Sequence, residues 1–199
     1  MSVAIIQGSS GAQGFALTKH LLSHTSLKLY ALTHRKSASE LIERLGGASD
    51  RLTVLEGVDV QEERGLETAA ETVKGREGKA SVRLVACLAG IVRDSSHDFL
   101  LDAHRNMQLH PEKSLAAVDP ITVSSSFAVN TIGHLLTYKH FVPLIPTKKE
   151  FRDFQNGLSD KEDPAKGLVG AENSLCWSLS ARIGSITDNA KGGWYSYRA

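Results

Sequence analysis

The stretch VAIIQGSSGAQGF at residues 3–15 sets the fold of this 199-residue chain. A short run with strand-forming residues is followed at once by Gly8, Gly11 and Gly14, and an apolar helical pattern begins at Phe15. Glycine permits the tight turn between a strand and a helix, and it lets the backbone approach a pyrophosphate at the helix N-terminus. This strand–loop–helix context predicts a nucleotide-binding turn, and the alternative is an ordinary turn between a strand and a helix.

Apolar runs and helical patterns alternate along the rest of the chain. Strands are expected at 3–7, 27–33, 52–60, 82–90 and 174–180, and helices at 15–22, 38–45, 63–75 and about 120–142. Continuous apolar runs are typical of a parallel sheet covered on both faces, and alternating strands and helices imply crossover connections. We therefore predict a doubly wound, Rossmann-like α/β fold with three layers.

The composition gives no reason to expect a nucleic acid or a membrane as partner. The formal net charge is +1, which provides no electrostatic attraction to polyanions. No run approaches the roughly 18 apolar residues of a membrane helix. Cys87 and Cys176 lie in apolar runs without metal-ligand spacing, so we expect buried, reduced thiols in a cytoplasmic protein and no metal site.

The length suits a single domain. We expect residues 1–199 to form one dinucleotide-binding domain. Residues 147–173 are charged, contain glycine and have few apolar side chains. Such a composition predicts a surface insertion within that domain.

The residues after the second strand bear on which dinucleotide binds. A site for NAD usually has a carboxylate there, which binds the ribose 2′-hydroxyl. This chain has Arg35 and Lys36 instead. Two cations suit the 2′-phosphate of NADP, so we predict NADP, with NAD as the alternative. A solvated basic loop would explain the same two residues.

Further cofactor contacts are expected at the ends of the third and fourth strands. Asp59 follows the third strand, where a polar side chain can hydrogen-bond an adenine, but it can equally cap the next helix. Ala89 and Gly90 are small enough to let a cofactor pack against the backbone. The expected cofactor contacts are Gly8, Ser10, Gly11, Gln13, Gly14, Arg35, Lys36, Asp59, Val60, Ala89 and Gly90.

Five stretches together resemble the short-chain dehydrogenase/reductase superfamily, and more narrowly its C-factor-like branch. They are GSSGAQG (8–14), CLAGI (87–91), LHPEKS (109–114), FAVNTIGHLLTYKHFVPLIP (127–146) and SARIGSITDNAKGGWYSYRA (180–199). The resemblance implies an enzyme that transfers a hydride between NADPH and a small carbonyl or alcohol substrate. Full-length members of this family are usually homo-oligomers.

The resemblance also implies catalytic roles. Tyr197 matches the family tyrosine, a general acid that protonates the carbonyl oxygen, and Asn130 matches the asparagine that positions a water for proton relay. Ala181 stands where the family serine usually holds the developing oxyanion. Of the flanking serines we favour Ser185, because strand alternation turns Ser180 away from the face of Ala181.

The family tyrosine is assisted by a lysine four residues later, whose charge favours the phenolate. The sequence ends at Ala199, two residues after Tyr197. We therefore expect a chain truncated just after the active-site tyrosine, with little or no turnover in this form. The alternative function is a catalytically inactive Rossmann-fold protein that binds dinucleotide or acts in signalling.

Overall fold

The computed structural model describes residues 2–35, 38–91, 112–156, 163–170, 173–189 and 192–198. The chain divides into two compact units. Unit 1 consists of Met1–Ala89 and His134–Leu179, and unit 2 of Gly90–Gly133 and Ser180–Ala199.

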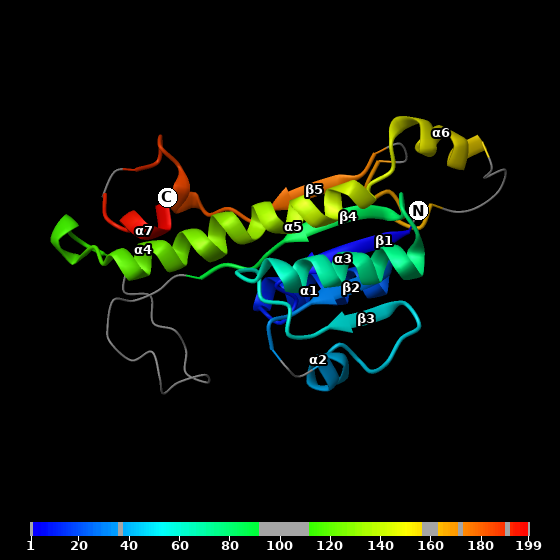
Figure 1. Cartoon of the computed structure of the whole chain (residues 1–199), viewed down its shortest axis with the longest axis horizontal. Coiled ribbons are helices and arrows are strands. Elements are labelled where there is room, and N and C mark those ends of the chain that lie inside the picture. The colour runs from blue at the N-terminus through cyan, green and yellow to red at the C-terminus, as the bar shows by residue number, and fades with distance from the viewer. Residues whose placement is uncertain are drawn as a thin grey trace. The chain divides into compact units, whose positions relative to one another are not determined.

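A five-stranded parallel sheet forms the centre of unit 1 (Figure 1). Its strands are β1 (Val3–Gln7), β2 (Lys28–Leu32), β3 (Leu52–Leu55), β4 (Val82–Cys87) and β5 (Leu175–Ser178). They lie in the order β3-β2-β1-β4-β5. The direction of chain progression reverses between β1 and β4, which is where sheets of this type bind ligands at the carboxyl ends of their strands. The predicted doubly wound α/β fold is confirmed.

Helices follow the strands in the expected alternation. Unit 1 contains α1 (Ala12–His24), α2 (Ala38–Arg44), α3 (Glu63–Glu77), α5 (Gly133–Phe141, from His134 on) and α6 (Lys148–Asn156). Unit 2 contains α4 (Pro120–Phe127) and α7 (Tyr195–Arg198). The helix expected at 120–142 is helical throughout, but a π-helical turn at Ala128–Ile132 separates α4 from α5.

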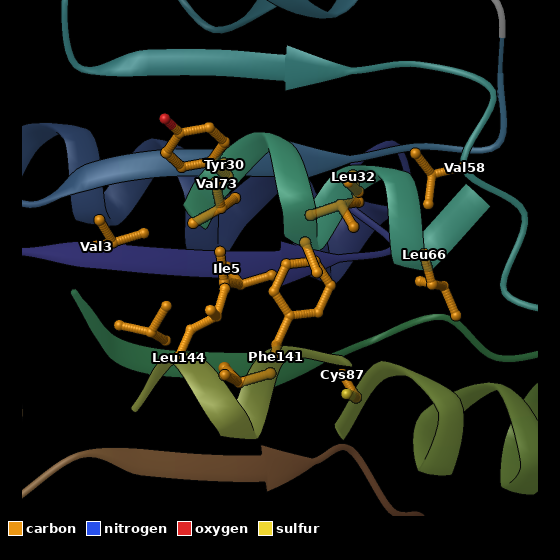
Figure 2. Close-up of a cluster of buried hydrophobic side chains, with 14 residues drawn as sticks. Val3, Ile5, Tyr30, Leu32, Val58, Leu66, Val73, Cys87, Phe141 and Leu144 are labelled. Atoms are coloured by element: carbon orange, nitrogen blue, oxygen red, sulfur yellow. The ribbon is translucent and has the colours of Figure 1, made fainter. Parts of the chain in front are cut away.

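Hydrophobic clusters cover both faces of the sheet in unit 1. Successive residues of a strand point to opposite faces, so Ile5 and Ile6 of β1 belong to different clusters. Ile5 packs in a cluster with Phe141 of α5 (Figure 2). Ile6 packs in a cluster with Leu21 of α1 and with Ala165. The strands β1, β2 and β4 are therefore buried between two layers, as their apolar runs predict.

Several element ends differ from the sequence-based prediction: α1 extends over Ala12–His24 and β4 ends at Cys87, and at two other ends a glycine with a positive φ angle follows. β3 ends at Leu55 rather than at residue 60, and Gly57 follows with a φ of +70°. α3 continues past Gly75 to Glu77, and Gly78 ends it with a φ of +83°. Glycine adopts such angles without steric cost, so these two positions terminate the elements.

The segment 147–173, expected to be a surface insertion, also contributes to the core of unit 1. It contains α6, whose Phe151 is buried. Ala165 and Val169 are buried in the cluster on the α1 face of the sheet. These apolar side chains are widely spaced in a charged sequence, so no periodic pattern indicated their burial.

A buried cation holds part of this segment against β4. Arg83 donates from Nε to the carbonyl of Asn173 and from Nη2 to the carbonyl of Gly170, each at 3.1 Å. Its Nη1 lies 3.8 Å from a carboxylate oxygen of Asp163. Burial lowers the pKa of Arg83, and the charge of Asp163 opposes that shift.

The two cysteines are free thiols in different environments. Cys87 is buried at the end of β4, where burial raises its pKa to about 12. Cys176 is exposed, which corrects the expectation that both thiols are buried. Among the described residues, its strand, β5, pairs on one side only, and most of its residues are exposed. Within the described part of the chain, no helix is long and apolar enough to span a membrane.

Candidate functional site

The glycine loop of unit 1 packs tightly against the backbone at the ends of β2 and β4. Gly8 has a φ of +81°, and a Cβ there would lie 2.5 Å from the backbone nitrogen of Ala89. A Cβ on Gly14 would lie 2.2 Å from the carbonyl oxygen of Gly8. Ser9 donates from both its backbone nitrogen and its Oγ to the carbonyl of Leu32. Only glycine fits at positions 8 and 14 without a backbone shift.

The N-terminus of α1 is exposed and carries no negative charge. Gly11 is the N-cap residue, no side chain caps the helix, and its first turn has no acidic residue. Gly11, Ala12 and Gln13 are exposed, and Ser10 is half-buried. The first N–H groups of a helix have no partner within the helix, and the helix dipole stabilises an anion beside them. These features fit a pyrophosphate, although the individual contacts of Ser10 and Gln13 stay predictions.

Arg35 lies exposed just after β2. Its backbone nitrogen donates to Thr33 Oγ1 at 3.2 Å, and its carbonyl accepts from the backbone nitrogen of Gly57 at 3.4 Å. No described residue pairs with its guanidinium group. The cation is therefore available for an anionic ligand. Lys36, the second predicted cation, lies outside the described residues.

Asp59 lies in the turn that leads into α3. Its Oδ1 accepts a hydrogen bond from the backbone nitrogen of Gln61 at 2.9 Å. The N-cap residue of α3 itself is Glu62, whose nitrogen donates to the carbonyl of Asp59 at 3.1 Å. Val60 is buried. Asp59 is therefore not the cap of α3, which corrects that alternative, and its contact with an adenine stays a prediction.

Gln7 and His134 are site residues that the sequence reasoning missed. The backbone nitrogens of Leu88 and Ala89 donate to Gln7 Oε1, at 3.0 and 2.9 Å. The carbonyl of Ala89 lies 2.7 Å from His134 Nε2. A glutamine that directly precedes the glycine loop in an apolar strand is a signal that could have identified Gln7. His134 lies 45 residues from Ala89 in the sequence, and nothing in its local pattern indicates this contact.

In unit 2, the side chain of Asn130 forms two hydrogen bonds with the backbone of Ile91. Its Oδ1 accepts from the nitrogen of Ile91 at 2.8 Å, and its Nδ2 donates to the carbonyl at 2.9 Å. A Cβ on Gly90 would lie 3.5 Å from the same Oδ1. Asn130 stands in the π-helical turn, a feature frequent at functional sites. Its amide holds the chain after β4, and its part in a proton relay stays a prediction.

α7, which carries Tyr197, begins after an unusual backbone turn in unit 2. Gly192, Gly193 and Trp194 have φ angles of +60°, +71° and +59°. A left-handed conformation costs a non-glycine residue such as Trp194 about 1–2 kcal/mol. The nitrogen of Trp194 donates to the carbonyl of Glu112 at 2.7 Å, which holds this turn. A Cβ on Gly193 would lie 2.9 Å from the same carbonyl oxygen.

Arg198 joins this turn to the preceding loop of unit 2. Its guanidinium group donates to the carbonyls of Gly192, Gly193 and Ile183. Tyr197 is half-buried beside it and its ring lies 6.0 Å from that of Trp194. Arg198 lies in α7, and its hydrogen bonds to three main-chain carbonyls that precede α7 therefore hold this helix in position.

The predicted oxyanion residue, Ser185, has a hydroxyl that already takes part in a turn. Its Oγ accepts from the nitrogen of Asp188 at 3.2 Å and lies 3.1 Å from Thr187 Oγ1. Ser180 is exposed and Ala181 is half-buried. Which serine would hold a substrate oxygen stays a prediction.

No group of three metal-ligating side chains gathers within the described ranges. His20 and His24 on α1 stack with their ring centroids 4.2 Å apart, and His24 Nδ1 lies 3.0 Å from the carbonyl of His20. These two histidines, four residues apart on one helix, therefore contact each other and the helix backbone.

Solved structures share this fold, whereas no protein-family profile and no curated protein matches the sequence. The NADPH-bound carbonyl reductase from chicken fatty liver is 21% identical with a TM-score of 0.66, and the similarity covers 99% of this chain and 67% of that one. The carbonyl reductase Sniffer of Drosophila melanogaster is 20% identical with a TM-score of 0.70, covering 99% and 68%. An alcohol dehydrogenase from Thermococcus sibiricus complexed with 5-hydroxy-NADP is 19% identical with a TM-score of 0.61, covering 100% and 66%. The chain thus spans about two thirds of the length of these proteins and has the Rossmann-like α/β fold of the carbonyl reductases.

Proposed function

We propose that this chain is an NADPH-dependent oxidoreductase of the short-chain type that resembles the C-factor-like branch. We propose further that it reduces a small carbonyl compound. The observation that carries the proposal is the glycine loop of unit 1. Gly8 and Gly14 leave no space for a side chain, and the exposed first turn of α1 suits a pyrophosphate. Carbonyl reduction is supported by the fold shared with carbonyl reductases, one of them bound to NADPH.

Each part of the cofactor has residues suited to hold it. The N–H groups at the start of α1 would bind the pyrophosphate, and Arg35 with Lys36 the 2′-phosphate. Asp59 would bind the adenine, and Ala89 would pack against the cofactor. When bound, NADPH supplies the hydride that reduces the carbonyl carbon. Tyr197 would then donate a proton to the carbonyl oxygen.

Ser185 and Asn130 would assist that proton transfer. Ser185 would hydrogen-bond the substrate oxygen as negative charge develops on it. Asn130 would position the water through which Tyr197 regains its proton. We also propose a cytoplasmic location, which two free thiols support.

Titration of the chain with NADPH and with NADH, followed by nucleotide fluorescence, tests cofactor binding. We expect tighter binding of NADPH, and we expect Arg35→Ser to weaken NADPH binding about tenfold through loss of a charge-assisted contact. The binding of NADH should change little. Arg64→Ser, at an exposed position of α3, is the matched control. If the chain binds neither nucleotide, the proposal is wrong.

A dinucleotide-binding protein without turnover is the second candidate. It is favoured by Ala181 at the expected serine position and by the Ser185 hydroxyl that accepts from Asp188. Oxidation of NADPH in the presence of small aldehydes and ketones separates the two functions. Turnover that is lost in Tyr197→Phe with unchanged NADPH affinity supports the reductase. Binding without turnover by the wild-type chain supports the second candidate.

A further inference from the structure

Side chains hold both backbone polar groups of Ala89, two residues after the end of β4 in unit 1. Its nitrogen donates to Gln7 Oε1 at 2.9 Å, and its carbonyl oxygen lies 2.7 Å from His134 Nε2. Gly8 packs so closely on Ala89 that a Cβ would lie 2.5 Å from its nitrogen. The glycine loop therefore packs directly against the backbone of Ala89. A shift of Ala89 would shift the loop with it.

The hydrogen bond to Ala89 determines which nitrogen of His134 carries the proton. A carbonyl oxygen only accepts, so Nε2 is the donor. In the neutral ring Nδ1 is then an acceptor, and its partner is Ser178 Oγ at 3.0 Å. Tyr138 OH lies 2.7 Å from the same Oγ. Because Ser178 gives its own proton to His134, Tyr138 is the donor to Ser178.

The hydrogen bonds therefore run in one direction from Tyr138 through Ser178 and His134 to Ala89. His134 is only 7% exposed, so a ring that lost either partner would leave a buried polar atom unpaired, at a cost. Hydrogen bonds that pair both nitrogens of this buried ring hold it in one geometry, and the exposed Ser178 connects it to Tyr138. The network connects the end of β5 and helix α5 to the residue beneath the glycine loop.

We propose that His134 is a positioning residue of the dinucleotide site. It holds the carbonyl of Ala89, and through Ala89 the glycine loop, in the arrangement that binds the cofactor, while Ser178 pairs the other ring nitrogen. The inference rests on the proposed function, since it assigns His134 a role in cofactor affinity. The Gly-x-x-Gly-x-x-Gly pattern that predicts the loop does not contain this residue.

The test compares NADPH affinity in variants of the 199-residue chain. We expect His134→Leu to raise the Kd for NADPH about tenfold, the change that loss of one hydrogen bond of typical strength produces. His134→Gln retains an N–H donor and should recover most of the affinity. His140→Gln is the matched control, because His140 lies on the same helix and its Nε2 contacts Glu63 instead, at 3.1 Å. Its Kd should equal that of the wild type.

Two further measurements cover the case in which His134→Leu does not fold. The 15N shifts of the His134 ring should show the proton on Nε2 in the wild type, and the shift of Nδ1 should change in Ser178→Ala, which removes its hydrogen-bond partner. Ser178→Ala should also raise the Kd for NADPH, and in a double variant with His134→Gln it should add less than it does alone.

The outcomes separate this inference from the function on which it rests. A wild-type chain that binds no dinucleotide overturns the proposed function and the inference with it. Equal Kd values for a folded His134→Leu and the wild type overturn the inference alone. A wild-type ring with its proton on Nδ1 also overturns it, because Nε2 could then not donate to Ala89.

Discussion

At the scale of single residues, the closest approach in the glycine loop lies between Gly14 and Gly8. A Cβ on Gly14 would stand 2.2 Å from the carbonyl oxygen of Gly8. We predict that Gly14→Ala weakens NADPH binding at least about tenfold and lowers the free energy of unfolding by about 1–3 kcal/mol, since the loop must move to admit the methyl group. Nucleotide titration and urea unfolding measure the two effects.

Gly75→Ala provides the matched control for this substitution. Gly75 lies within α3, and a Cβ there would meet no atom within 4 Å. We expect the control to raise the free energy of unfolding by about 0.5–1 kcal/mol, as alanine does in a helix, and to leave NADPH affinity unchanged. Equal NADPH affinity in Gly14→Ala and Gly75→Ala would show that the close approach is irrelevant to binding.

At the scale of elements, Arg83 connects β4 to the segment before β5. Arg83→Met would leave the carbonyls of Gly170 and Asn173 without this donor, and we predict a loss of about 1.5–3 kcal/mol in the free energy of unfolding. Urea unfolding measures it. The control is Arg182→Met, because Arg182 is exposed and its pair with Asp188 is worth less than about 1 kcal/mol. A similar, small loss in both variants would contradict the prediction.

The elements that sequence could predict are those whose side chains repeat regularly. The strands form apolar runs, and all five of the described strands were found, although β3 and β4 end earlier than expected. α6 was missed because it is mostly charged and its buried Phe151 gives no periodic signal. Arg83 looked like one polar interruption of an apolar strand, since its partners lie 87 and 90 residues further along the chain.

The same distinction applies to the candidate site. The spacing of Gly8, Gly11 and Gly14 predicts a tight loop because glycine is required locally, and the structure has that loop. The contacts of His134 depend on residues at least 44 positions away. Such contacts arise from the packing of α5 on the sheet, which no local pattern encodes. The catalytic assignments of Tyr197, Ser185 and Asn130 stay predictions.

At the scale of the whole molecule, tyrosine and cysteine side chains with raised pKa values make the free energy of unfolding sensitive to alkaline pH. Burial, followed by the hydrogen bond to Glu77, raises the pKa of Tyr30 from 10.0 to about 12. Burial likewise raises the pKa values of Tyr138 and Cys87 to about 12. Below the unfolded pKa these groups are neutral in both states and their full contribution to stability is present. As pH rises further, the unfolded chain loses its protons first, so unfolding becomes more favourable.

We therefore predict that the free energy of unfolding falls between about pH 10 and pH 12, as the unfolded and folded pKa values of Tyr30 require. Urea unfolding at intervals across this range measures the fall. Tyr30→Phe should flatten part of the pH dependence, while losing about 1 kcal/mol at neutral pH with the bond to Glu77. An identical pH profile in Tyr30→Phe would refute the assignment to this residue.

The discontinuity of unit 1 has a consequence for the order of events during synthesis. Residues 90–133 belong to unit 2, so the two chain segments that build unit 1 leave the ribosome separately. β1 to β4 can pair while the chain grows. Val85 of β4 cannot pair with Cys176, its partner on β5, until that later residue has been synthesised. Closing so long a loop slows folding, and meanwhile β4 presents an unpaired apolar edge to other nascent chains. Chaperone demand should therefore peak before residue 178 emerges.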